Sequence, residues 1–117
     1  MYCNEPQFTM GVEEEYLLVD KETRALVADP PESLIRECEE LLGKQVTTEL
    51  LRSQIEIGTK VCANVQEVRE DLVRLRKTII EVAARHGIAP IACSTHPFSL
   101  WSEQKHTRKD RYDSLTT

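Results

Sequence analysis

The chain has 117 residues, of which 40% are hydrophobic and 30% charged; this suits one globular domain and is too apolar for a disordered chain. Its 15 basic and 20 acidic residues give a net charge of −5, which argues against nucleic acid or an anionic membrane as a partner. No apolar run reaches transmembrane length and no signal-peptide pattern is present, so we expect a cytoplasmic protein.

The first predicted strand covers residues 8–19 and contains three consecutive glutamates. Because side chains alternate along a strand, Glu13 and Glu15 share one face while Glu14 points to the other with Tyr16 and Leu18. Two carboxylates about 7 Å apart on one strand face repel each other unless a cation lies between them. Mg²⁺, which takes oxygen ligands, is a suitable cation. The alternative is a solvated face or a charged edge strand that blocks aggregation.

The next elements are predicted from apolar periodicity and turn residues. Residues 25–28 return toward the first strand as a hairpin after a polar turn. A helix is expected over 32–42, ending at Gly43. Residues 45–59 read as a second long strand with Arg52, Gln54 and Glu56 on one face and Ile55 and Ile57 on the other, which is typical of an antiparallel sheet backed by helices.

The strongest helical pattern follows Asn64, which forms a capping-box-like start with Glu67. Apolar residues then recur at spacings of three and four until Gly87, predicting an amphipathic helix of roughly 22 residues; a coiled coil is the alternative. Residues 88–94 are expected to form a third long strand with Pro90 near its start. Residues 95–98 form a turn, and 102–117 are expected to be polar and mobile.

Several polar residues are candidates for chemistry. If the second strand lies beside the first, Glu56 joins Glu13 and Glu15 as a third carboxylate for Mg²⁺, and Glu49 is a possible fourth acid. Arg52 and Gln54 on the same face would suit a carboxylate or phosphate ligand; the alternative is that Glu49 and Arg52 form a surface pair of little consequence.

Cysteine chemistry is not favoured by the spacing of Cys3, Cys38, Cys62 and Cys93. No C-x-x-C pair is present, so we expect neither a zinc site nor a thioredoxin-type motif. We expect the thiols to be free and mostly buried. His96 lies in a loop after a strand, where functional groups often occur. Cys93 is close to it in sequence but does not form a dyad with it by spacing alone. No glycine-rich phosphate loop is present.

In their order and spacing these motifs resemble the type 2 glutamate–cysteine ligases and related carboxylate–amine ligases. The matching pieces are residues 8–20, 49–56, Thr59, Cys62, 85–87, 95–98, Trp101 and 111–112. The resemblance implies an α+β protein: an antiparallel sheet with helices packed on one face, in a glutamine-synthetase-like ligase fold that is incomplete in this chain. We expect residues 1–117 to form a single partial domain, the N-terminal portion of a ligase catalytic domain, because family members are roughly three times longer.

The resemblance also implies an activity. Such ligases use ATP to phosphorylate a carboxylate, typically the γ-carboxylate of glutamate, and an amine such as cysteine then forms the amide. It assigns Glu13, Glu15 and Glu56 as Mg²⁺ ligands, and it places Thr95 and His96 at the substrate cleft. Arg52 and Gln54 are our candidates for contacting ATP.

The shortness of the chain keeps two other functions open. One is an inactive module that self-associates as a homo-oligomer through an open sheet edge, and the other is a simple divalent-metal binder that needs only the glutamates.

Overall fold

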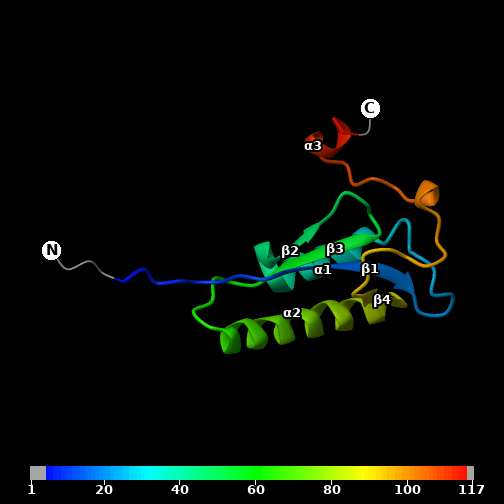
Figure 1. Cartoon of the computed structure of the whole chain (residues 1–117). Coiled ribbons are helices and arrows are strands. Elements are labelled where there is room, and N and C mark those ends of the chain that lie inside the picture. Colours follow the sequence, from blue (N-terminus) through cyan, green and yellow to red (C-terminus); the bar gives the residue numbers. More distant parts are fainter. Residues whose placement is uncertain (1–4, 116–117) are drawn as a thin grey trace.

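The computed structural model describes residues 5–115 (Figure 1). Its elements, in chain order, are β1 (Glu13–Asp20), α1 (Glu32–Leu42), a 3₁₀ turn (Gly43–Gln45), β2 (Val46–Thr48), β3 (Gln54–Gly58), α2 (Val65–Arg85), β4 (Ile88–Ile91), a second 3₁₀ turn (Trp101–Glu103) and α3 (Asp110–Asp113). None of the described helices has the length and apolarity that a membrane span requires.

The four strands form one antiparallel sheet in the order β2-β3-β1-β4. β1 therefore lies inside the sheet, and the strands that pair with it come from much later in the chain. The register places Tyr16 opposite Ile55 and Glu15 opposite Glu56. Side chains opposite each other in a sheet share a face, so this register separates an apolar face from an acidic one.

Helices α1 and α2 cover the apolar face. The core contains Tyr16 and Leu18 from β1, Ile55 and Ile57 from β3, and the buried stripes of both helices; those stripes comprise Leu34, Cys38 and Leu42 of α1 and Leu75, Ile79, Val82 and Ala83 of α2. Figure 1 shows α2 on one side of the sheet and the C-terminal α3 on the other. The expected α+β class, an antiparallel sheet with helices packed on one face, is confirmed.

Both main helices begin and end as the sequence predicts. Gly43 terminates α1 with a φ of 58°, a left-handed conformation that glycine adopts without strain. At the start of α2 the side chain of Asn64 accepts a hydrogen bond from the Glu67 N–H, and Glu67 in turn accepts one from Ala63 N–H. Val65, the first residue of α2 and the first apolar residue of the predicted stripe, is instead 71% exposed.

The predicted first strand is too long at its start. Regular pairing begins at Glu13, although an isolated bridge between Met10 and Cys62 continues the contact with the segment after β3. The expected hairpin partner at 25–28 is likewise reduced to one bridge, between Val19 and Leu26. Each segment makes too few ladder hydrogen bonds to count as a strand.

The predicted strand at 45–59 is two strands. Residues 49–53 turn between β2 and β3, which pair with each other as an antiparallel hairpin. β4 is also shorter than predicted: Cys93 N–H donates to the Ile91 carbonyl, so the chain bends away from β1 and residues 92–94 leave the sheet.

The sequence predicts a mobile segment over residues 102–117, but residues 102–115 are held against the rest of the fold. Backbone hydrogen bonds join Arg52 N–H to the Lys105 carbonyl and Thr107 N–H to the Leu50 carbonyl. Tyr112 is 4% exposed. The segment is therefore packed onto the β2–β3 turn.

The cysteines are free and mostly buried, as predicted: Cys38 and Cys62 are buried and Cys93 is partly buried. Cys3 lies outside the described residues.

Candidate functional site

The three glutamates of β1 divide between the two faces of the sheet, as alternation predicts. Glu14 points toward the helices, where its carboxylate forms an ion pair with Arg76 of α2 and accepts a hydrogen bond from the Tyr16 hydroxyl. The Arg76 hydrogen bond, which outweighs partial burial, holds the Glu14 pKa below its usual value. Glu14 is thus a structural anion, distinct from its two neighbours.

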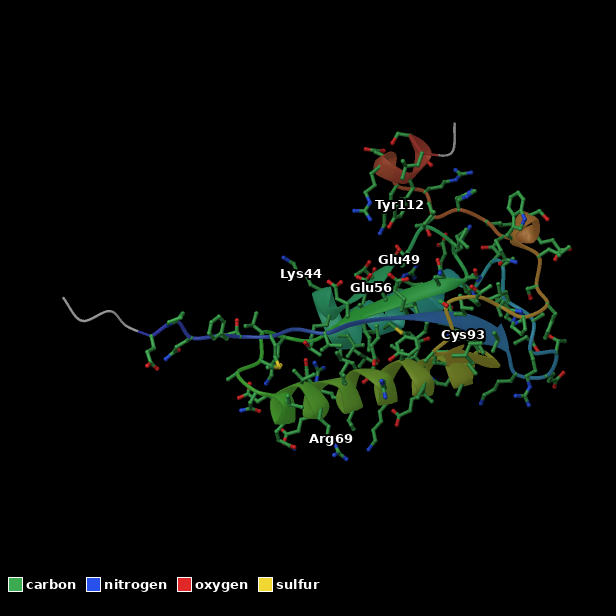
Figure 2. The ribbon with its side chains drawn as sticks, in the orientation of Figure 1. Lys44, Glu49, Glu56, Arg69, Cys93 and Tyr112 are labelled. Atoms are coloured by element: carbon green, nitrogen blue, oxygen red, sulfur yellow. The ribbon has the colours of Figure 1, made fainter. Side chains whose placement is uncertain are left out.

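On the opposite face, three carboxylates converge. Glu15 lies directly across from Glu56 in the β1–β3 register, and Glu49 comes from the turn after β2. One carboxylate oxygen from each of the three lies within 4.8 Å of the others. We call Glu15, Glu49 and Glu56 the carboxylate triad. Figure 2 shows Glu49 and Glu56 together on the side of the sheet away from α2.

Electrostatics show that the triad is a site of repulsion. The pKa of Glu56 is raised, first by burial and then by the charge of Glu49, the charge of Glu13, a hydrogen bond shared with Glu49, and the charge of Glu15. No basic residue appears among these influences. Adjacent carboxylates that are not neutralised destabilise the fold, and a bound cation would remove that penalty.

The donor set is suited to a hard divalent cation. All ligand atoms are carboxylate oxygens, which Mg²⁺ and Ca²⁺ prefer, whereas zinc sites favour nitrogen and sulfur. Mg²⁺ in proteins is often held by a few carboxylates and keeps other positions for water or substrate phosphate. The triad fits that pattern. Glu13 is near enough to act on Glu56 electrostatically but is not within the converging group. Glu49, predicted as a possible fourth acid, is part of that group.

Arg52 and Gln54 do not share a sheet face as expected. Arg52 lies in the turn before β3 and forms an ion pair with Asp29, at 2.9 Å; Lys105 binds the same carboxylate. The expected alternative, a Glu49–Arg52 surface pair, is therefore not the arrangement seen. Gln54 lies next to the triad, since it lines with Glu15 a hollow of about 310 Å³. Of Arg52 and Gln54, only Gln54 lies beside the triad, and a contact of either residue with ATP stays a prediction.

His96 organises its loop through both ring nitrogens. Its Nε2 is 2.7 Å from the Arg24 carbonyl, so it is the donor there. Its Nδ1 accepts hydrogen bonds from Ser99 N–H at 3.0 Å and Phe98 N–H at 3.3 Å. The imidazole is thus occupied by backbone groups, and any role in substrate binding is one of positioning. Thr95 is exposed on the same loop.

Lys109 is a residue that sequence reasoning missed. Its Nζ donates to the Thr48 carbonyl at 2.9 Å, which places a cation beside the residue that precedes Glu49. Tyr112, over whose ring Lys109 also lies, is on the same side of the sheet as Glu49 and Glu56 (Figure 2). No local pattern links residue 109 to residue 48, because the contact depends on how the C-terminal segment folds back.

Comparison with known proteins gives the family of the chain. The model of glutamate-cysteine ligase family 2 (GCS2) matches residues 9–117. The chain belongs to this family. The predicted family resemblance is therefore confirmed, and the ligase fold expected from it is consistent with the open antiparallel sheet.

Individual relatives cover almost the whole chain. A protein of Rhodospirillum rubrum named "putative glutamate–cysteine ligase 2" is 54% identical over 95% of this chain, and one of Jannaschia sp. with the same name is 51% identical over 96%. A more distant relative with that name, from Chloroflexus aurantiacus, is 40% identical over 90%. The chain spans 30%, 29% and 27% of these relatives, respectively, so their whole-protein activity is a proposal for this chain.

Proposed function

We propose that this chain supplies the metal-binding part of an ATP-dependent carboxylate–amine ligase similar to glutamate–cysteine ligase. The single observation that carries the proposal is the carboxylate triad on the helix-free face of the sheet. The names of the family and of the relatives support the ligase class. The proposal includes Mg²⁺ and ATP, glutamate and an amine as substrates, and a cytoplasmic location.

The residues of the chain have distinct roles in this scheme. Glu15, Glu49 and Glu56 would hold Mg²⁺, with Glu13 adding negative charge next to them. When bound, the metal would neutralise phosphate charge during phosphoryl transfer, a reaction that depends mainly on positioning and electrostatics. Lys109, whose Nζ donates to the carbonyl of Thr48 next to Glu49, would offset the charge of a phosphate bound at the triad.

In the proposed reaction, ATP supplies the phosphoryl group that activates the carboxylate. The γ-phosphoryl group passes to a substrate carboxylate, releasing ADP; the amine then attacks the acyl carbon, and the bond to phosphate breaks as the amide forms. Since the chain spans about 30% of its relatives, we expect it to bind Mg²⁺ and ATP as a single partial domain and to be inactive by itself.

Isothermal titration of the purified chain tests the proposal, with ATP in the presence and absence of Mg²⁺. We expect binding only with Mg²⁺, and a loss of that binding in Glu15→Gln and Glu56→Gln. Glu14→Gln is the matched control, because it removes one carboxylate from the same strand but on the other face. Equal weakening by all three substitutions, or no binding to a folded wild-type sample, would overturn the assignment of the triad.

A second candidate function is self-association through β1. β4 pairs with β1 only along Leu17–Asp20. Within residues 5–115 no strand therefore pairs with residues 13–16 of β1 on that side, and exposed strand edges favour pairing with another chain. Sedimentation equilibrium distinguishes the two functions. A tight dimer that is indifferent to Mg²⁺ and ATP supports the module, whereas a monomer that binds nucleotide supports the ligase.

A further inference from the structure

The segment at residues 5–12, which we call the arm, continues the line of β1 past the end of the sheet (Figure 1). From residue 7 onward its apolar side chains alternate with small or uncharged polar ones, in the order Gln7, Phe8, Thr9, Met10, Gly11, Val12. Alternate residues of an extended chain point to opposite faces, so the arm has one apolar face. Phe8 on that face is 82% exposed, which leaves an aromatic ring free to pack against another surface.

The arm and the first half of β1 share one open backbone edge. On the β3 side, Met10 pairs with Cys62 through both its N–H and its carbonyl. Alternate residues of a strand direct these groups to opposite edges, so residues 9, 11, 13 and 15 direct theirs away from β3. β4 reaches that edge only at Leu17. Among the described residues, the edge at 9–15 is therefore available to a further strand.

The flank of α2 on the same side is apolar and exposed. Arg76 marks this flank, because it binds Glu14 of β1, whereas Asp71 on the opposite flank binds the N–H of Lys60 after β3. Three exposed apolar residues share the side of Arg76 by helical spacing; they are Val65, Val73 and Ile80. A hollow of about 410 Å³ lies along residues 65–76 of this flank. The open edge thus has an apolar helix surface beneath it.

We infer that the partner for this surface is a second copy of the chain, related by a twofold axis perpendicular to the sheet. Each arm lies antiparallel along β1 of the other copy, and the two α2 flanks pack against each other beneath the joined strands. Such an axis keeps the helices of both copies on one face of a continuous sheet, and the interface is self-complementary. The inference rests on the second candidate function, self-association through β1, and supplies its partner and its register.

Charge limits the position of the axis. An axis at residue 10, 13, 14 or 15 would place a glutamate of one copy opposite a glutamate of the other, which destabilises a sheet. An axis at Val12 avoids this conflict. It places Gly11 opposite Glu13. Thr9 lies opposite Glu15, so the hydroxyl of the second copy's Thr9 is beside the carboxylate triad, where it is able to donate a hydrogen bond.

The side chains that face the helices favour the same axis. With the axis at Val12, Phe8 lies opposite Tyr16, and aromatic pairs across strands are stabilising. An axis at residue 11 would instead place Phe8 opposite Glu14. Beyond residue 8 the arm meets the end of β4, which occupies the edge from residue 17 onward. Pro6 lies just past that point, and a residue without an N–H suits the place where the arm leaves the sheet.

A cysteine at the axis tests the register. Residues that form a non-hydrogen-bonded antiparallel pair have Cα atoms about 4.5 Å apart, a separation that allows a disulfide. In a chain carrying Cys3→Ser and Cys93→Ser, whose other two thiols are buried, we expect Val12→Cys to form a disulfide-linked dimer on mild oxidation without Mg²⁺ or nucleotide. Met10→Cys is the matched control on the same face, and it should not cross-link because it lies opposite residue 14. Cross-linking through Met10→Cys, or through neither variant, would overturn the inference.

Sedimentation equilibrium of three further variants separates the interface from folding. Thr9→Pro removes an N–H from the arm, outside the regular strands, and Val73→Glu places a charge between the two α2 flanks. Each should weaken dimerisation at least about tenfold. Leu41→Glu makes a similar change at an exposed position of α1 and should dimerise like the parent.

Two results of this experiment would overturn the inference. One is equal dimerisation of Val73→Glu and Leu41→Glu, and the other is a parent chain that is monomeric at about 100 μM. The proposed functions fail separately: a monomer that binds ATP with Mg²⁺ leaves the ligase proposal standing, and a dimer that does not cross-link at Val12→Cys leaves self-association standing without this register.

Discussion

Glu15 of β1 lies directly opposite Glu56 of β3 in the antiparallel register. Like charges in this relationship destabilise a sheet, and Glu49 adds a third carboxylate to the same place. Under the proposed function, the fold exchanges stability at this position for the capacity to bind a cation. That exchange can be measured, because stability and metal binding should respond in opposite directions to the same substitution.

Glu56→Gln should make the metal-free chain more stable. Removing one charge from the triad relieves repulsion across the sheet, which is worth about 0.2–1 kcal/mol. The variant should also lose most of the stabilisation that Mg²⁺ confers on the parent, about 2.7 kcal/mol at one hundred times Kd. Urea unfolding in EDTA and in excess Mg²⁺ measures both effects. A metal-free variant less stable than the parent would contradict the repulsion argument.

The stability of the metal-free chain should carry a pH signature of Glu56. Its pKa in the folded state is raised above the ordinary 4.5, so between those two values the native state binds more protons than the unfolded state. Stability therefore falls as pH rises through this window. Subtracting the pH profile of Glu56→Gln, measured in EDTA, from that of the parent isolates the contribution. A difference that is flat, or that grows with pH, would show that Glu56 is not the titrating group.

Glu14→Gln should behave in the opposite way. Its carboxylate holds Arg76 and the Tyr16 hydroxyl, so its loss should cost about 1 kcal/mol, a modest value because Arg76 is half exposed. The pKa of Glu14 is depressed; its contribution is thus present above the ordinary value of 4.5 and is lost as pH falls through the folded pKa. Thermal unfolding at pH 7 and pH 3 checks both, and a cost that is as large at pH 3 as at pH 7 would contradict the ion-pair explanation.

The sequence predicted the parts of the fold that depend on local chemistry. Alternation placed Glu13 and Glu15 on one face and Glu14 on the other, and the capping pattern at Asn64 located the start of α2. These signals act within a few residues, where side-chain direction and backbone hydrogen bonds follow from the residues themselves.

The rest depends on contacts between distant segments. β-branched residues at 45–59 favour extended backbone on either side of a turn, and nothing local shows that Glu49 lies on that turn and therefore reaches Glu56. The prediction that Arg52 shares a sheet face with Gln54 and Glu56 was wrong for the same reason, because Arg52 also lies on this turn. The position of Lys109 follows only from the packing of the C-terminal segment against residues 48–52. No pattern in the sequence predicts that packing.

Asp71 should be the most costly acidic residue to remove outside the site. It is 6% exposed, and its carboxylate accepts hydrogen bonds from Lys60 N–H, the Gln45 side chain and Arg74. Gln45 also donates to the Gly58 carbonyl, so the network fixes the end of β3 to α2. We expect Asp71→Ala to lower the free energy of unfolding by about 2–3 kcal/mol, because it leaves buried donors without partners.

The pH dependence of that loss distinguishes the network from simple packing. Burial alone would raise the Asp71 pKa, but the hydrogen bonds from Lys60, Arg74 and Gln45 outweigh it and the pKa is lowered from 3.8. Its stabilisation is therefore complete above 3.8 and disappears as pH falls through the folded value. Asp71→Asn, which keeps the size and one acceptor oxygen, is the matched control. Hydrogen exchange of the Lys60 amide should accelerate in Asp71→Ala and much less in Asp71→Asn, and equal exchange in all three proteins would show that this carboxylate does not hold the end of β3.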